Sequence, residues 1–165
     1  MRLIDPILVE LDQEAQTTRR VLERVPEDKL TWKPHPKSWS LGQLALHIAT
    51  TPGSVSSIAA QDRFEAPNFD QPEAKSRAEI LDAFAKSVAT AKDLLNQIDD
   101  ARAMATWTFA KGGKVLMAVP RIGMIRTILL NHSYHHRWQL SVYLRLLNVP
   151  VPSIYGPSAD ENPFA

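Results

Sequence analysis

Apolar residues recur at steps of three and four along most of the chain, a spacing that predicts four amphipathic helices. The predicted segments cover residues 3–24, 41–60, 80–98 and 121–147. Each is several turns long and carries an apolar stripe along one side, with polar residues on the other. Segments of this length and pattern are typical of helices that bury one face against one another.

The start of the second predicted helix carries the clearest local signal. Ser40 and Gln43 have the spacing of a capping box, in which each side chain accepts a hydrogen bond from the other residue's backbone N–H. Trp39 stands where it could pack on Leu44 as a hydrophobic staple. We expect Trp39, together with Trp32 in the preceding Pro-rich segment, to cover one end of the core.

Residues 106–120 break the helical periodicity. Apolar and polar residues alternate on both sides of Lys111-Gly112-Gly113-Lys114, which is typical of two short strands joined by a Gly-Gly turn. The polar stretch 61–76, which contains Pro67 and Pro72, is predicted to be a loop.

These elements predict an all-α fold, a four-helix bundle with a small β-hairpin between the third and fourth helices. A chain of 165 residues can bury a sizeable core as one domain, so we expect a single domain over residues 1–165. Because the connections are long, the order of the helices need not be simple up-down-up-down.

Charge and composition argue against several classes of function. The 19 basic and 18 acidic residues leave a net charge of +1 without a run of like charge, so we expect no nucleic-acid or membrane partner. The chain shows no 18-residue apolar span, and its first residues include acids. We therefore expect neither a transmembrane helix nor a signal peptide, and we interpret the protein as cytoplasmic. With no cysteine, any metal must be bound by nitrogen and oxygen ligands.

Three of the five histidines lie in NHSYHHRWQL, residues 131–140, within the fourth predicted helix. At about 100° per residue, His132 and His136 fall near the centre of the apolar stripe, one turn apart, whereas His135 lies at its edge. A buried neutral imidazole needs partners for both nitrogens, and the i, i+4 spacing lets two rings bind one ion. Histidines that are satisfied within the core are the alternative.

His47 is a third candidate ligand. It lies in QLALHIA, at the border of the apolar face of the second helix, from where it can face a neighbouring helix. Three neutral imidazoles leave one to three positions open for water or substrate, and an ion there lowers the pKa of a bound water or thiol. The alternative is a half-exposed His47 bonded to a backbone carbonyl. His35 is interpreted as a surface residue. The acids of the first helix are interpreted as solvated charges: Glu10, Asp12 and Glu14.

Three stretches, in order, resemble the DinB-like (DinB/YfiT) superfamily of four-helix bundles. WKPHPKSWSLGQLALHIA resembles the family's Trp- and Pro-containing approach to the second helix, with the first histidine at His47. NHSYHHRWQLSVYLRLLNVPVP resembles the His-x-x-x-His-Arg motif followed by Gln-Leu. The matching residues there are His132, His136, Arg137, Gln139 and Leu140. The ending PSIYGPSADE resembles that of a subgroup, so the resemblance covers nearly the whole chain.

The resemblance implies an up-down-down-up bundle, frequent homodimers and a divalent metal ion, often nickel or zinc, on His47, His132 and His136. In some relatives the ion activates a low-molecular-weight thiol, such as bacillithiol, mycothiol or glutathione, for transfer or isomerisation. The family usually has a less crowded residue at the position of His135, so this imidazole could compete for the ion. Iron and copper also accept imidazole ligands.

Two functions are consistent with these residues. The first is a metal-dependent enzyme, a thiol S-transferase or a hydrolase, in which the ion acts as a Lewis acid towards a small molecule. In that case Arg137 could orient an anionic group, although we expect it to make a structural ion pair. Tyr143 and Trp107 could line the pocket, although we expect both to pack in the core. The second function is a stress-response or binding module with a structural metal or none.

Overall fold

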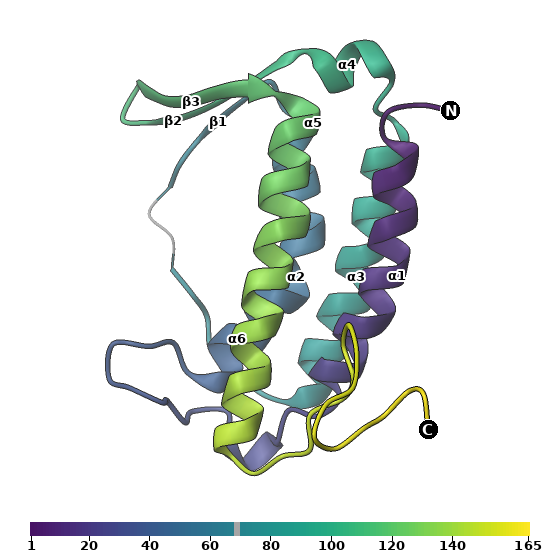
Figure 1. Cartoon of the computed structure of the whole chain (residues 1–165). Helices are drawn as coiled ribbons and strands as arrows, with labels where there is room; N and C mark the ends of the chain where they lie inside the picture. The colour runs from purple at the N-terminus through teal and green to yellow at the C-terminus, as the bar shows by residue number, and fades with distance from the viewer. Residues whose placement is uncertain (68–69) are drawn as a thin grey trace.

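The structure is a computed structural model, and it describes residues 1–67 and 70–165. Four long helical segments lie side by side (Figure 1). They are α1 (Asp5–Leu22), α2 (Leu41–Ala59), α3 (Arg77–Asn96) and a continuous run of α5 (Arg121–Met124), η2 (Ile125–Asn131) and α6 (His132–Leu146). The prediction of a mostly helical chain is confirmed. In the described part of the chain, every helix is too short or too polar to span a bilayer.

The core consists of two clusters of apolar side chains between the helices. One cluster joins α2, α3 and α6 and includes Leu44, Ile80 and Tyr143. The other lies nearer the sheet and includes Leu129 and Trp107. Trp107 and Tyr143 are only 1% and 4% exposed, which confirms that both pack in the core.

The predicted capping box begins α2. The Ser40 hydroxyl accepts from the Gln43 N–H at 3.0 Å, and the Gln43 side chain accepts from the Ser40 N–H at 3.0 Å. Because both bonds form, the first turn of α2 has a defined orientation. His47 follows in the second turn of α2.

A three-stranded sheet lies at one end of the helices (Figure 1). The predicted hairpin is confirmed: β2 (Thr106–Lys111) pairs antiparallel with β3 (Lys114–Pro120), and Gly112 and Gly113 have φ angles of 58° and 79°. Such angles suit glycine and are typical of tight hairpin turns.

The third strand was not predicted. β1 (Arg63–Glu65) pairs parallel with β2, so the prediction of a loop over residues 61–76 is wrong for these three residues. A strand this short has no periodicity of its own, and β2 supplies its partner groups only in the folded chain. Residues 68 and 69 of that predicted loop lie outside the described residues. Two further short elements were not predicted, η1 (Glu27–Lys29) and α4 (Asp100–Met104).

The fourth long segment changes its helical type before the histidines. η2 is a π-helix of seven residues that leads directly into α6 at His132. A π-helix bonds i to i+5 and therefore turns less per residue than an α-helix. One helical wheel therefore does not hold across both η2 and α6, but His132 and His136 both lie within α6 and keep α-helical spacing. π-helical turns are frequent at functional sites.

A buried arginine joins the two helices that carry the candidate ligands. Arg121, at the start of α5, is fully buried and donates to the backbone oxygens of Ala59 and Gln61 at the end of α2. It also donates to Arg102 O at 3.1 Å and pairs with Asp62 at 2.5 Å. Its charge thus satisfies carbonyls that the end of α2 leaves free.

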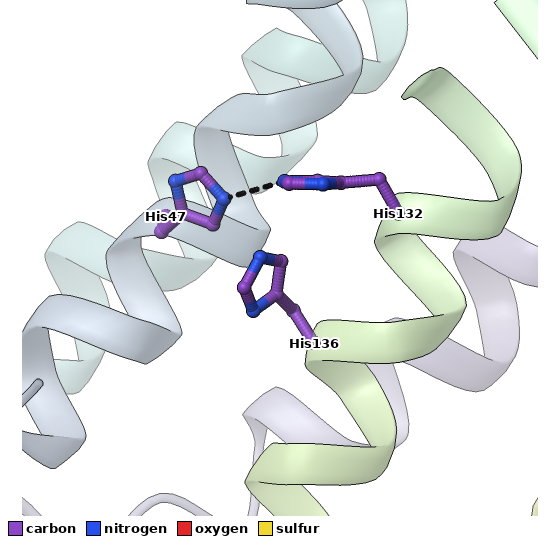
Figure 2. A group of neighbouring side chains, drawn as sticks. All are labelled: His47, His132 and His136. Atoms are coloured by element: carbon purple, nitrogen blue, oxygen red, sulfur yellow. Dashed lines mark hydrogen bonds between the residues drawn. The ribbon is translucent and has the colours of Figure 1, made fainter. Parts of the chain in front are cut away.

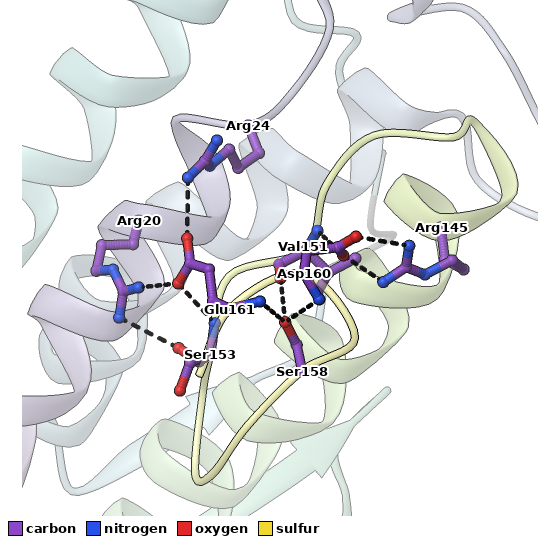
Figure 3. Close-up of polar contacts among 8 residues, drawn as sticks. All are labelled: Arg20, Arg24, Arg145, Val151, Ser153, Ser158, Asp160 and Glu161. Carbon is purple, nitrogen blue, oxygen red and sulfur yellow. Dashed lines mark hydrogen bonds and ion pairs between the residues drawn. The ribbon is translucent and has the colours of Figure 1, made fainter. Parts of the chain in front are cut away.

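The C-terminal residues after α6 fold back on the opposite end of the helices. Glu161 pairs with Arg20 of α1 and with Arg24, which lies just after α1, the latter at 3.0 Å (Figure 3). Asp160 pairs with Arg145 of α6. Each exposed pair is worth only about 0–1 kcal/mol, but together they tie the tail to both helices.

Candidate metal centre

The side chains of His47, His132 and His136 meet between α2 and α6 (Figure 2). One nitrogen from each ring lies within 4.8 Å of the others. The Nε2 atoms of His47 and His132 are 3.0 Å apart. The ring centroids are separated by 5.2 Å for His47–His132, 4.6 Å for His47–His136 and 4.4 Å for His132–His136. The predicted convergence of the three imidazoles is confirmed.

All three rings favour the neutral form. Burial, together with the neighbouring His136 and His132, lowers the pKa of His47 to about 4. Burial, with smaller contributions from His136 and His135, likewise lowers the pKa of His132 to about 4. The pKa of His136 is also lowered, chiefly by burial. At neutral pH each ring therefore keeps an unprotonated nitrogen that can bind a cation.

Trp39 borders the site, and the sequence did not predict this role. Its indole stacks on His136 with a centroid distance of 5.6 Å and an interplanar angle of 21°, and it lies 5.0 Å from His47. It is 37% exposed, so it forms an aromatic wall between these two rings and solvent. The sequence feature that could have indicated this role is the position of Trp39 directly before Ser40, the N-cap of the helix that carries His47. The expectation that Trp39 lids the core missed its contact with the imidazoles.

Two glutamines contact the rings from outside. Gln139 Oε1 is 3.0 Å from His136 Nδ1. The Gln71 side chain hydrogen-bonds His47, which opposes the lowering of that pKa. Reciprocal bonds between the side chain of each residue and the backbone oxygen of the other, at 2.9 and 3.1 Å, hold Gln71 against Gln43. Gln43, the third residue of α2 and a member of its capping box, therefore also holds Gln71 in place near His47.

The other histidines lie apart from the three-nitrogen group. His35 is exposed, as predicted, and its Nδ1 accepts from the Lys37 N–H at 3.2 Å. His135 is exposed, and its ring centroid is 4.9 Å from that of His136. The group that could hold an ion does not include His135. The geometry therefore favours His132 and His136 over His135 as the pair on α6.

Arg137 makes the structural ion pair that we expected from the sequence. It is 1% exposed, and its guanidinium lies 2.6 Å from Glu14 Oε2. It also donates to Thr18 Oγ1 at 3.0 Å and to the Tyr155 hydroxyl. The guanidinium lies on the α1 side of α6, so the pair helps to hold α6 in the rotation that turns His136 towards α2.

The acids of α1 are engaged with cations. Glu10 pairs with Arg126 at 2.6 Å and Asp12 with Lys92 at 2.8 Å, both at partly exposed positions. The interpretation of Glu14 as a solvated charge is wrong, because its side chain is only 17% exposed and is paired with a buried arginine. Its partner lies on another helix, and the sequence of α1 alone could not show it.

A family model described as the DinB superfamily matches residues 10–140. The chain belongs to the DinB superfamily. A Bacillus subtilis (strain 168) relative, the uncharacterized protein YrdA, is 28% identical over 159 residues, which are 96% of this chain and 91% of YrdA.

Two solved structures of DinB-like proteins resemble this DinB-superfamily chain. One, from Bacillus cereus ATCC 10987, is 26% identical, has a TM-score of 0.72 and is matched over 90% of this chain and 95% of that chain. The other, YjoA from Bacillus subtilis, has a TM-score of 0.69 over 91% of this chain and 98% of that chain, at 15% identity. The second comparison supports the fold alone.

The donor set of this DinB-superfamily chain suits a divalent transition-metal ion. Three neutral imidazoles from two facing helices are typical nitrogen ligands, and zinc–nitrogen bonds of about 2.0–2.1 Å fit nitrogens a few ångströms apart. The Nε2 atoms of His47 and His132 lie 3.0 Å apart, so both can face the same ion in the tautomers that leave Nε2 unprotonated.

Proposed function

We propose that the protein is a metal-dependent enzyme of the DinB superfamily, with a divalent ion on His47, His132 and His136. The ion would activate a thiol or water for transfer to, or hydrolysis of, a small molecule. The observation that supports this most is the convergence of three neutral imidazole nitrogens within 4.8 Å. Nickel and zinc are the ions that we propose first, with iron and copper as further candidates.

The chemistry assigned to the ion is that of a Lewis acid, which lowers the pKa of a bound thiol or water towards neutrality. The protein would contribute neutral ligands at pH 7, since the pKa values of His47 and His132 are about 4. Trp39 would shield His47 and His136 from solvent on one side and offer a flat apolar surface to a substrate.

The proposal also includes the direction of the four long helices, the substrate and the oligomeric state. α1 and α5 begin at the end of the molecule that carries the sheet, whereas α2 and α3 begin at the other end (Figure 1), which supports an up-down-down-up bundle. We propose a small molecule as substrate, with a low-molecular-weight thiol as co-substrate, in a cytoplasmic homodimer. A screen of bacillithiol, mycothiol and glutathione with electrophilic acceptors would identify which thiol is the co-substrate.

The decisive experiment is elemental analysis of protein that is purified without a histidine tag and reconstituted with nickel or zinc. We expect about one ion per chain in the wild type and a large loss in His132→Ala. His35→Ala is the matched control, because it removes an exposed imidazole outside the group. Equal metal content in His132→Ala and His35→Ala would refute the proposal.

A non-catalytic stress-response or binding module is the second candidate. It is supported by the two apolar clusters, because bundles of this kind fold on hydrophobic packing without needing an ion. Under this alternative, no thiol transfer or hydrolysis is found in the metal-loaded protein, and chelation changes the melting temperature strongly only if a structural ion is bound. If the protein is a metal-dependent enzyme, removing the ion abolishes turnover.

A further inference from the structure

Gln139 lies one turn after His136 on α6 and contacts one nitrogen of its ring. The distance from Gln139 Oε1 to His136 Nδ1 is 3.0 Å. Residues three apart share a helix face, and helical side chains lean towards the N-terminus, so Gln139 reaches back to His136. An amide oxygen can only accept a hydrogen bond, so this contact places the proton of His136 on Nδ1.

The position of this proton decides whether the ring can bind a cation. A neutral imidazole has one N–H and one bare nitrogen, and only the bare nitrogen is a ligand. With the proton on Nδ1, Nε2 is free. Without an acceptor at Nδ1, a fraction of the rings would carry the proton on Nε2, and that fraction could not bind the ion.

We propose that Gln139 is a positioning residue that keeps His136 in the Nδ1–H tautomer and so presents His136 Nε2 to a divalent ion. This inference rests on the proposed metal site and extends it beyond the three ligands.

The size of the expected effect follows from the behaviour of groups that orient metal ligands. Loss of such a group typically weakens metal binding about 10- to 100-fold, because the ligand loses both its tautomer and its ring orientation. Gln139→Leu keeps the approximate size of the side chain and removes the acceptor. Gln139→Glu keeps an acceptor in the same place and should restore binding.

The test combines two measurements on tag-free protein. The first is nitrogen-detected NMR of the histidine rings in the chelated wild type, which reports the tautomer of His136 without any ion. The second is calorimetric titration with Zn²⁺ of the wild type, Gln139→Leu and Gln139→Glu. Gln16→Leu is the matched control, because Gln16 is exposed on α1.

We expect the Nδ1–H form of His136 in the wild type, a 10- to 100-fold loss of Zn²⁺ affinity in Gln139→Leu, and near-normal affinity in Gln139→Glu and Gln16→Leu. An Nε2–H form in the wild type, or equal affinity of Gln139→Leu and Gln16→Leu, would overturn the inference. A wild type that binds no Zn²⁺ but shows the Nδ1–H form would refute the metal site while supporting the tautomer assignment.

Discussion

Acidification from pH 7 to pH 5 should weaken the binding of Zn²⁺ far less than three ordinary imidazoles would allow. A histidine with a pKa of about 6.5 loses roughly 25-fold of its metal affinity over this range through competition with protons. Two such residues lose roughly 600-fold, or about 4 kcal/mol. His47 and His132, each with a pKa of about 4, together lose only about 1.2-fold, since they stay neutral down to pH 5.

The rest of the loss of Zn²⁺ affinity between pH 7 and pH 5 depends on His136. Its pKa is lowered from 6.5, so its own loss is smaller than that of an ordinary imidazole. The total weakening should therefore stay below about 30-fold, compared with roughly 15,000-fold for three unshifted rings.

Calorimetric titration of tag-free apo-protein with Zn²⁺ at both pH values measures the change directly. A peptide of residues 128–140, which is too short to fold, provides the reference for unshifted imidazoles. NMR titration of the chelated protein adds the midpoints of the individual rings. A loss of affinity above about a thousandfold, or midpoints of His47 and His132 near 6.5, would show that burial does not keep these rings neutral.

Three further results are expected. Chelated protein should lose stability as the pH falls from about 6.5 towards 4, because the imidazoles bind protons in the unfolded chain but stay neutral in the folded one. Denaturant unfolding of the wild type and of a His47→Gln variant at pH 7 and pH 5 measures this loss. An equal loss of stability in both proteins would contradict the prediction. Glu14→Gln should cost about 3–5 kcal/mol in denaturant unfolding, since it leaves the charge of Arg137 buried without its partner, whereas Asp12→Asn should change stability by under about 1 kcal/mol. Binding of Ni²⁺ or Cu²⁺ should quench tryptophan fluorescence in the wild type and much less in Trp39→Phe, because this indole stacks on the candidate ligand His136.

The sequence by itself determined those features whose signals are local. The periodicity of the apolar residues, the Ser40–Gln43 box and the Gly112-Gly113 turn each depend on residues a few positions apart, so the helices, the start of α2 and the hairpin could be predicted. The same holds for His132 and His136, because an i, i+4 pair within one helix has a fixed mutual geometry.

Only the tertiary structure decided the features that join distant segments. It places His47 against His132, 85 positions apart, pairs β1 with β2, and buries Glu14 against Arg137. It also lowers the pKa values of the rings, since burial depends on what the other helices cover. These contacts link side chains from separate elements. The local spacing of residues determines neither the distance between such side chains nor how far they are buried from solvent.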